Sequence, residues 1–398
     1  MNQFNKRLQR NIISDYFYTF INNLNMASCI WVLYLGFHGM NLMQIGILEG
    51  IYHITGILFE IPSGAIADLL GRKKSLLVGR ILMAVSCIIM LFSTTFTGFA
   101  IGFILQSLSG NFNSGAEEAL VYDSLKLLDK DDAYPAISGR INMLIEVSQS
   151  IATVMGSVLA EYSFGLCYFA CVIISLIGII PALCMVEPPI HDTLGSDSSH
   201  ADGILAIFRR HFSESRNILE ENPKILFVIL YYSIIFASFT LLFFYSQQYF
   251  TDLGLNKIEL SVIMVFAGIT ACLGALLSNK LHQLLKEKVA CIGAIGIALC
   301  IVAFGFNNLY VAIGALLISD FFNSALYPIQ SATLNGLIPS EKRATLLSVN
   351  SMFFSIFMIL LFPVAGAIAD VVGLAVSFII IGTAVLIVTP ILYWISIR

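Results

Sequence analysis

Charged residues are scarce in this sequence of 398 residues. Asp, Glu, Lys and Arg make up 12% of it, whereas hydrophobic residues make up 58%. A soluble domain carries about 25% charged residues, so the composition excludes an ordinary soluble protein. The mean hydropathy of +0.87 agrees with a chain of about twelve membrane spans, each of about 20 apolar residues. The net charge of −4 says little, because the charges are segregated by loop. The partners that we expect are the lipid bilayer and a small-molecule substrate, and we expect no nucleic acid.

Motifs that carry chemistry are also missing. The eight cysteines lie in apolar runs without CxxC spacing, which favours buried packing residues over a disulfide framework or a metal site. No HExxH, GxSxG or nucleotide-binding P-loop motif appears. We therefore expect neither an enzyme nor a cofactor, and secondary transport is favoured over ATP-driven transport.

Apolar runs broken by turn residues predict twelve helices in two sets of six. One long polar segment, 187–222, separates the sets, and within it residues 204–219 have the spacing of a basic amphipathic helix. The predicted domains are an N-terminal six-helix bundle at 1–186, a linker at 187–222 and a C-terminal six-helix bundle at 223–398. The predicted helices are 11–37, 41–69, 75–94, 97–128, 134–161, 164–186, 223–250, 256–279, 288–306, 308–337, 342–370 and 373–396.

Lys and Arg are distributed very unevenly among the predicted loops. If the N-terminus is cytoplasmic, almost all of them fall in inside loops or near inside helix ends, and only Lys257 falls outside. The positive-inside rule then places both termini in the cytoplasm. The sequence thus predicts a multi-pass protein of a bacterial-type plasma membrane.

A short motif repeats along the chain. Gly64-Ala65-Ile66-Ala67-Asp68-x-x-Gly71 recurs as Gly366-Ala367-Ile368-Ala369-Asp370-x-x-Gly373, and weaker copies end the predicted fifth and eighth helices. On the predicted topology the four copies alternate between the two sides of the membrane. Three-helix units repeated in alternating orientation predict this arrangement.

The turn from Gly64 to Lys74 resembles the signature of the major facilitator superfamily between helices 2 and 3. The resemblance implies an all-α membrane protein with twelve transmembrane helices in two pseudo-symmetric six-helix bundles, which work by alternating access. It also implies that the turn locks the bundles on the cytoplasmic side. Where the family's drug exporters have a basic residue on helix 4, this chain has Gln106, and Arg140 is a candidate replacement. The residues that match the signature, and that we expect to form the gate, are Gly64, Asp68, Gly71, Arg72, Lys73 and Lys74.

The physics of this turn agrees with a gate. Asp68 ends a predicted helix, where the macrodipole disfavours an anion, so it needs a cationic partner or another helix N-terminus. Arg72 and the start of the predicted eleventh helix are the candidates. Gly64 removes a side chain where two helices would approach closely. The alternative is that Arg72 and Lys73 only anchor the loop in the cytoplasm.

Seven of the ionisable side chains inside the predicted spans are candidates for a functional role. Each charge at the bilayer centre costs about 2.5–3.5 kcal/mol, so we expect these groups to face a cavity, face one another or carry a proton. Glu117 and Glu118 are the first candidates for proton exchange, because mutual repulsion and desolvation favour the protonated form; structural hydrogen bonding is the open alternative. For Glu49 that alternative is favoured. The remaining cavity candidates are Asp320, Glu146, Glu60, His53 and the polar Asn22.

These features predict a proton-coupled exporter of amphipathic small organic molecules, an antiporter of the multidrug type that acts as a monomer. Uptake or facilitated diffusion of a polar metabolite is the second reading, because Asn and Gln residues line the predicted helices 1, 5 and 7. A membrane sensor that transports nothing is the third.

Overall fold

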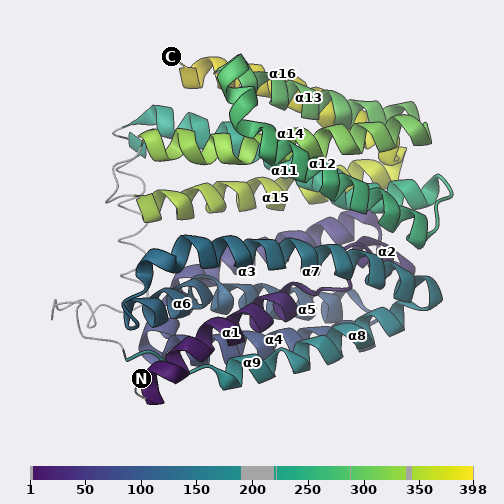
Figure 1. The fold of residues 1–398 in the computed structure, drawn as a ribbon. Helices are drawn as coiled ribbons and strands as arrows, with labels where there is room; N and C mark the ends of the chain where they lie inside the picture. Colours follow the sequence, from purple (N-terminus) through teal and green to yellow (C-terminus); the bar gives the residue numbers. More distant parts are fainter. Residues whose placement is uncertain (1–2, 190–218, 221, 287, 338–342, 398) are drawn as a thin grey trace. The chain divides into compact units, whose positions relative to one another are not determined.

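The computed structural model describes residues 3–189, 219–220, 222–286, 288–337 and 343–397 (Figure 1). For residues 3, 4, 68, 69, 343–345, 396 and 397 it describes the backbone alone. All regular structure in these ranges is helical. Most of the amphipathic helix predicted at 204–219 lies outside the described residues.

The described residues form two compact units. Unit 1 comprises those within Met1–Ser28 and Ile54–Arg209, and unit 2 those within Cys29–His53 and Arg210–Arg398. The helix α3 (Leu42–Leu70) therefore contributes to both units. The predicted domain boundaries at 187–222 stay a prediction.

In unit 1, α4 packs against α5 and α8, and α1 packs against α6, α7 and α9 (Figure 1). Buried Tyr18, Leu76 and Leu120 belong to the core that joins α1, α4 and α6. At one end, the Asn11 amide donates to Ser124 Oγ (2.9 Å) and to the Val186 carbonyl (2.8 Å). The remaining unit 1 helices are α1 (Gln3–Asn23), α4 (Arg72–Phe92), α5 (Phe96–Asn113), α6 (Ala116–Lys126), η1 (Asp131–Ala133), α7 (Tyr134–Tyr162), α8 (Phe164–Ile177) and α9 (Ile179–Cys184).

In unit 2, α12 packs along α14, and α16 packs against α11 and α13. An aromatic cluster closes one end of this core, where the Tyr249 hydroxyl donates to the Phe304 carbonyl at 2.6 Å and both rings contact Phe378. The unit 2 helices are α2 (Trp31–Phe37), α11 (Pro223–Asp252), α12 (Lys257–Leu285), α13 (Lys288–Ala303), η3 (Phe304–Phe306), α14 (Leu309–Leu337), α15 (Arg343–Val372) and α16 (Leu374–Ile397).

Two of the predicted spans are not found as single membrane-crossing helices among the described residues. A third, 164–186, breaks only at Gly178, between α8 and α9, and still counts as one candidate span. The described residues contain 10 helices that are long and apolar enough to cross a membrane, and α1, α5 and α6 are not among them. The predicted helix 11–37 is divided into α1 and α2, and the predicted helix 97–128 is divided into α5 and α6. The all-helical fold is thus confirmed, but the first and fourth predicted spans are interrupted.

Local chemistry accounts for both interruptions. After α1, the Asn25 side chain accepts a hydrogen bond from the Ala27 amide at 3.1 Å, an Asx arrangement that competes with helix. A Cβ at Gly156 of α7 would collide with the Met26 carbonyl, so this glycine lets α7 approach the interruption. Between α5 and α6, Gly115 has a φ of 73°, which a residue with a Cβ rarely adopts.

Candidate functional site: a carboxylate cavity in unit 1

One face of α1 carries four polar side chains: Asp15, Tyr18, Thr19 and Asn22. Their spacing of three, four and seven residues puts them on one side of the helix. Asp15 and Tyr18 are fully buried, and Thr19 is 1% exposed. A helix that buries such a face needs polar partners on its neighbours.

Three of these four side chains have such partners. The Tyr18 hydroxyl donates to Asn113 Oδ1 at 2.5 Å. The Thr19 hydroxyl donates to a Glu117 carboxylate oxygen. Asn22 Oδ1 accepts from the Arg80 guanidinium at 2.5 Å. The polar face of α1 therefore joins α4, the end of α5 and the start of α6.

Arg80 is a cation buried within unit 1, with 1% of its surface exposed. Its guanidinium also lies 3.4 Å from the Ser175 carbonyl of α8 and 6.0 Å from the centre of the Tyr18 ring. A Cβ at Gly178 would overlap this guanidinium, so the glycine between α8 and α9 makes the room for it. Arg140, in contrast, is exposed on α7.

A cavity of about 290 Å³ opens where α1, α6 and α7 meet the interruption after α5. We call it the carboxylate cavity. It is lined by side chains of three acids and several amides and hydroxyls, and every lining residue belongs to unit 1. The lining residues are Asp15, Asn22, Asn23, Asn113, Ser114, Gly115, Glu117, Glu118, Val121, Tyr134, Ser138, Ile141, Asn142 and Ile145.

Asp15 is the unusual member of this cavity. It is 0% exposed, and both carboxyl oxygens are without a hydrogen-bond partner in the described part of the chain. It interacts electrostatically with Glu117, which itself interacts with Glu118 and Arg80. A buried carboxylate without donors is costly as an anion, so this position favours a bound proton or a cationic ligand.

The structure brings together three of the residues predicted for the cavity in unit 1. Glu117, Glu118 and Asn22 all line the carboxylate cavity. Two others do not line it: Glu146 is exposed on α7, and Glu60 is exposed on α3. The transport roles predicted for all five residues stay predictions.

In unit 2 the predicted His53 lies in a small polar cluster. Its Nε2 is 3.5 Å from a Glu49 carboxylate oxygen, and its Nδ1 is 3.1 Å from Ser355 Oγ. Asp320 lies apart on α14; it is 7% exposed, and its Oδ2 has no hydrogen-bond partner among the described residues. Their predicted roles in coupling are also untested.

The turn between α3 and α4 is held by a carboxylate that the sequence did not single out. Glu187, after α9, accepts hydrogen bonds from the backbone amides of Arg72 and Lys73, both at 2.8 Å. Gly71 has a φ of 97°, and a Cβ there would lie 2.9 Å from the Glu187 carboxyl carbon. The Arg72 guanidinium forms an ion pair with Asp123 of α6 and donates to the Ala119 carbonyl at 2.9 Å. This network stays within unit 1.

Two expectations for this turn concern the partner of Asp68 and the helix packing at Gly64. The side chain of Asp68 lies outside the described residues, as does the loop before α15, so the expected partner of Asp68 is not described. A Cβ at Gly64 would meet no described atom within 4 Å. Gly64 is exposed among the described residues, and the close helix approach expected there stays a prediction.

The repeated motif at the end of α15 shows the tight approach instead. A Cβ at Gly366 would overlap the Leu42 carbonyl at the start of α3. Asp370 accepts hydrogen bonds from the backbone amides of Leu42 and Met43, both at 2.9 Å. All of these residues belong to unit 2, so this copy of the motif joins the end of α15 to the start of α3 within that unit.

Comparison with known proteins identifies the family. The family model described as Major Facilitator Superfamily matches residues 16–290 and 251–398. The chain belongs to this superfamily. The MFS-type transporter YxaM of Bacillus subtilis (strain 168), whose function is uncharacterized, is 23% identical over 381 residues, 93% of this chain and 91% of YxaM.

Solved structures show the same fold. The nucleoside transporter NupG has a TM-score of 0.76 at 14% identity, over 100% of both chains. A bacterial homologue of the human lysosomal transporter Spinster has a TM-score of 0.75 at 15% identity, over 100% of this chain and 97% of its own. The superfamily member described here is thus a multi-pass membrane transporter.

Three residues of these networks escaped the sequence analysis: Asp15, Arg80 and Glu187. A signal existed for Asp15, because it continues the polar face of Asn22 and Thr19 one turn earlier. For Arg80, the basic residues Arg72 to Lys74 shortly before it indicate only a helix end near the membrane surface. For Glu187 the following prolines marked only the end of a helix, and no local pattern links it to Arg72.

Proposed function

We propose that this superfamily member is a proton-coupled secondary transporter that exports amphipathic small organic molecules. In this proposal the coupling proton binds in the carboxylate cavity, at Asp15 and Glu117. The observation that carries it is the Asp15 carboxyl, which is fully buried, lines the cavity and has no hydrogen-bond partner among the described residues.

The surroundings of Asp15 favour a group that gains and loses charge. As an anion, the buried Asp15 would lie near the Glu117 carboxylate without a hydrogen-bond donor among the described residues, which is expensive. A proton removes that charge, and a cationic substrate compensates for it. Arg80 donates to Asn22 and interacts electrostatically with Glu117, so it favours a negative charge on Glu117.

Competition between the proton and the substrate cation for the carboxylate cavity then couples the transport of one to the transport of the other. A substrate cation that enters the carboxylate cavity favours the ionised acids, so the proton leaves; a proton that returns from the other side favours release of the substrate. Alternating access converts this competition into antiport, because only one of the two ligands accompanies each change of conformation.

Reconstituted vesicles test the coupling. With ethidium as the probe and an imposed pH gradient, we expect accumulation by the wild type, and loss of gradient-driven accumulation in Asp15→Asn by about 5–150-fold, the usual range of coupling between two ligands. Asp15→Asn should unfold at the same temperature as the wild type or higher, because it removes a buried charge.

The matched control is Asp132→Asn, an acid in η1 that is exposed and outside the cavity lining. It should transport like the wild type. If Asp15→Asn retains full gradient-driven accumulation, the proton site is elsewhere; if ethidium addition never dissipates the pH gradient in the wild type, antiport of this substrate class is wrong.

Uptake of a polar metabolite is the second candidate. Asn22, Asn23, Asn113 and Asn142 line the carboxylate cavity, and amides suit uncharged polar substrates. The fold is also that of NupG, described as a nucleoside transporter. Uridine uptake into the same vesicles separates the two functions: uptake without ethidium movement supports this candidate, and movement of neither probe favours the non-transporting reading.

A further inference from the structure

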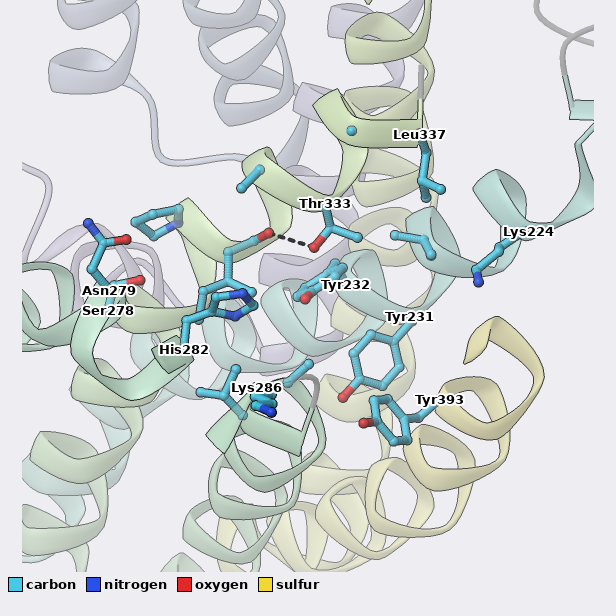
Figure 2. A pocket seen from close by; sticks show the side chains of 17 residues that line it. Lys224, Tyr231, Tyr232, Ser278, Asn279, His282, Lys286, Thr333, Leu337 and Tyr393 are labelled. Atoms are coloured by element: carbon cyan, nitrogen blue, oxygen red, sulfur yellow. Dashed lines mark hydrogen bonds between the residues drawn. The ribbon is translucent and has the colours of Figure 1, made fainter. Parts of the chain in front are cut away.

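Unit 2 contains a second and larger cavity. Its volume is about 620 Å³, and it lies between α11, α12, α13, α14 and α16 (Figure 2). All of its lining residues belong to unit 2, so it is separate from the carboxylate cavity of unit 1. We call it the basic pocket.

The mouth of the basic pocket carries positive charge. Lys224 lies in the first turn of α11, His282 lies in the last turn of α12, and Lys286 is the C-cap of α12. All three are exposed and line the pocket. No Asp or Glu is among the described lining residues. An anion placed at this mouth would therefore meet two cations and an imidazole.

The floor of the pocket is aromatic. Tyr231 and Tyr232 are only 2% and 3% exposed, and the Tyr231 ring lies 5.8 Å from that of Tyr393 (Figure 2). Apolar side chains such as Val228 and Val289 complete the wall. This surface accepts an alkyl or aromatic group.

One polar atom on this floor is left without a partner. The Tyr231 hydroxyl is buried and makes no hydrogen bond within the described part of the chain, whereas the nearby Thr333 hydroxyl donates to the Ile329 carbonyl at 2.8 Å. A buried hydroxyl normally has a partner, so an acceptor oxygen of a ligand would complete this site.

We propose that the basic pocket binds an organic phosphate. Its anionic head lies among Lys224, His282 and Lys286, with one oxygen accepting a hydrogen bond from the Tyr231 hydroxyl, and its apolar body packs against the tyrosine rings and the aliphatic wall. The charge of the mouth, the apolar floor and the unpartnered Tyr231 hydroxyl all fit this class of ligand. The head belongs either to an anionic phospholipid, which basic pockets between transmembrane helices bind, or to a free organic phosphate. The proposal stands independently of the transport function proposed for unit 1.

Titration of the full-length protein in phosphatidylcholine nanodiscs with hexyl phosphate tests the proposal, with hexanol as the uncharged probe. We expect saturable binding of hexyl phosphate and none of hexanol. Lys286→Gln should raise the Kd by about 10-fold or more, the usual effect of removing a charged hydrogen-bond donor. Lys280→Gln is the matched control, because Lys280 lies on the same helix and is exposed but does not line the pocket.

Tyr231→Phe provides a variant that does not depend on charge. It should raise the Kd for hexyl phosphate several-fold, while the unfolding temperature without ligand stays the same or rises, because the variant removes an unsatisfied hydroxyl. Equal affinities for Lys286→Gln and Lys280→Gln, or equal binding of hexanol and hexyl phosphate, would overturn the proposal.

Nanodiscs that contain phosphatidylglycerol distinguish the two sources of the phosphate. If this lipid raises the unfolding temperature of the wild type but not of Lys286→Gln, and blocks hexyl phosphate, the occupant is a lipid headgroup. If hexyl phosphate binds equally in both kinds of nanodisc, the occupant is a free organic phosphate. Either result supports an organic phosphate site, and no binding in either nanodisc contradicts it.

Discussion

Arg80 shows how one buried cation determines the residues around it. Its guanidinium donates to Asn22, and a Cβ at Gly178 would overlap it. A guanidinium has five donors and stays charged, so unit 1 can bury it only where carbonyl oxygens and a side-chain acceptor converge. The absence of a side chain at Gly178 is part of that arrangement.

Gly178→Ala should therefore destabilise unit 1. The added methyl would displace the Arg80 guanidinium from its acceptors, at a cost of about 1–3 kcal/mol for an overpacked core. Gly139→Ala on α7 is the control, because a Cβ there would meet no described atom within 4 Å; it should be neutral or stabilising, since alanine favours helix. Thermal unfolding of both purified variants measures the difference, and equal unfolding temperatures would mean that Arg80 relocates freely.

For single residues, the sequence indicated which acids belong to the cavity better than it indicated which groups surround them. The acids Glu117 and Glu118 were selected because an ionisable group in a span requires an explanation, and both line the carboxylate cavity. Asp15 was overlooked because it stands near the basic N-terminal residues, where an acid needs no special environment. Burial depends on which helices surround a residue, and that information is not local.

Among the helical elements, two long helices begin at a carboxylate supplied by a distant segment. Glu187 accepts from the first amides of α4, and Asp370 accepts from the first amides of α3. The amides of a first helical turn lack partners within the helix and carry a partial positive charge. Each acid thus satisfies two donors and fixes where its own segment lies against the helix.

Glu187→Ala should loosen the turn at Gly71. Loss of a helix cap costs about 0.5–2 kcal/mol, so we expect a lower unfolding temperature, with Glu187→Gln in between because the amide oxygen still accepts one hydrogen bond. Transport should fall if the turn is a gate. Glu146→Ala serves as the control for removing a carboxyl. An unchanged unfolding temperature in Glu187→Ala would show that other groups cap α4.

Asp370→Ala should release the start of α3. Hydrogen exchange of the Leu42 and Met43 amides, measured by mass spectrometry on peptides that cover them, should accelerate about tenfold for each 1.4 kcal/mol lost, and hydrogen bonds to a charged acceptor contribute about 1.5–3 kcal/mol. Exchange at the start of α12, which Asn256 and Glu259 cap, should not change. Equal acceleration at both helices would indicate general destabilisation instead.

The sequence predicted where helices lie because apolar runs are a strong local signal. It did not predict the interruptions after α1 and α5. Apolar residues continue on both sides of Asn25 and of Ser114-Gly115, and the turn signals inside those runs were outweighed by their surroundings. These interruptions carry the Asn25 turn and the lining residues Ser114 and Gly115, so the parts that matter for the candidate site were the least predictable.

For the whole molecule, the orientation in the membrane is still a proposal from the distribution of Lys and Arg. Single cysteines in a background without the eight native ones test it. Thr94→Cys and Lys257→Cys should react with a membrane-impermeant thiol reagent in intact cells. Asp129→Cys, in the loop after α6, should react only after permeabilisation. The reverse pattern would invert the topology and place both termini outside.

The weak apolarity of α1, α5 and α6 has a consequence for biosynthesis. None of the three qualifies as a span on its own, and α6 carries acids in its first turn and Lys126 in its last. Yet α1 and α6 pack against each other in the finished protein. At about 5–20 residues per second, the ribosome makes α6 several seconds after α1. During that interval α1 lacks its contacts with α6, and Asp15 lacks its cavity neighbour Glu117, so the part of unit 1 that joins these helices forms only after α6 has been made.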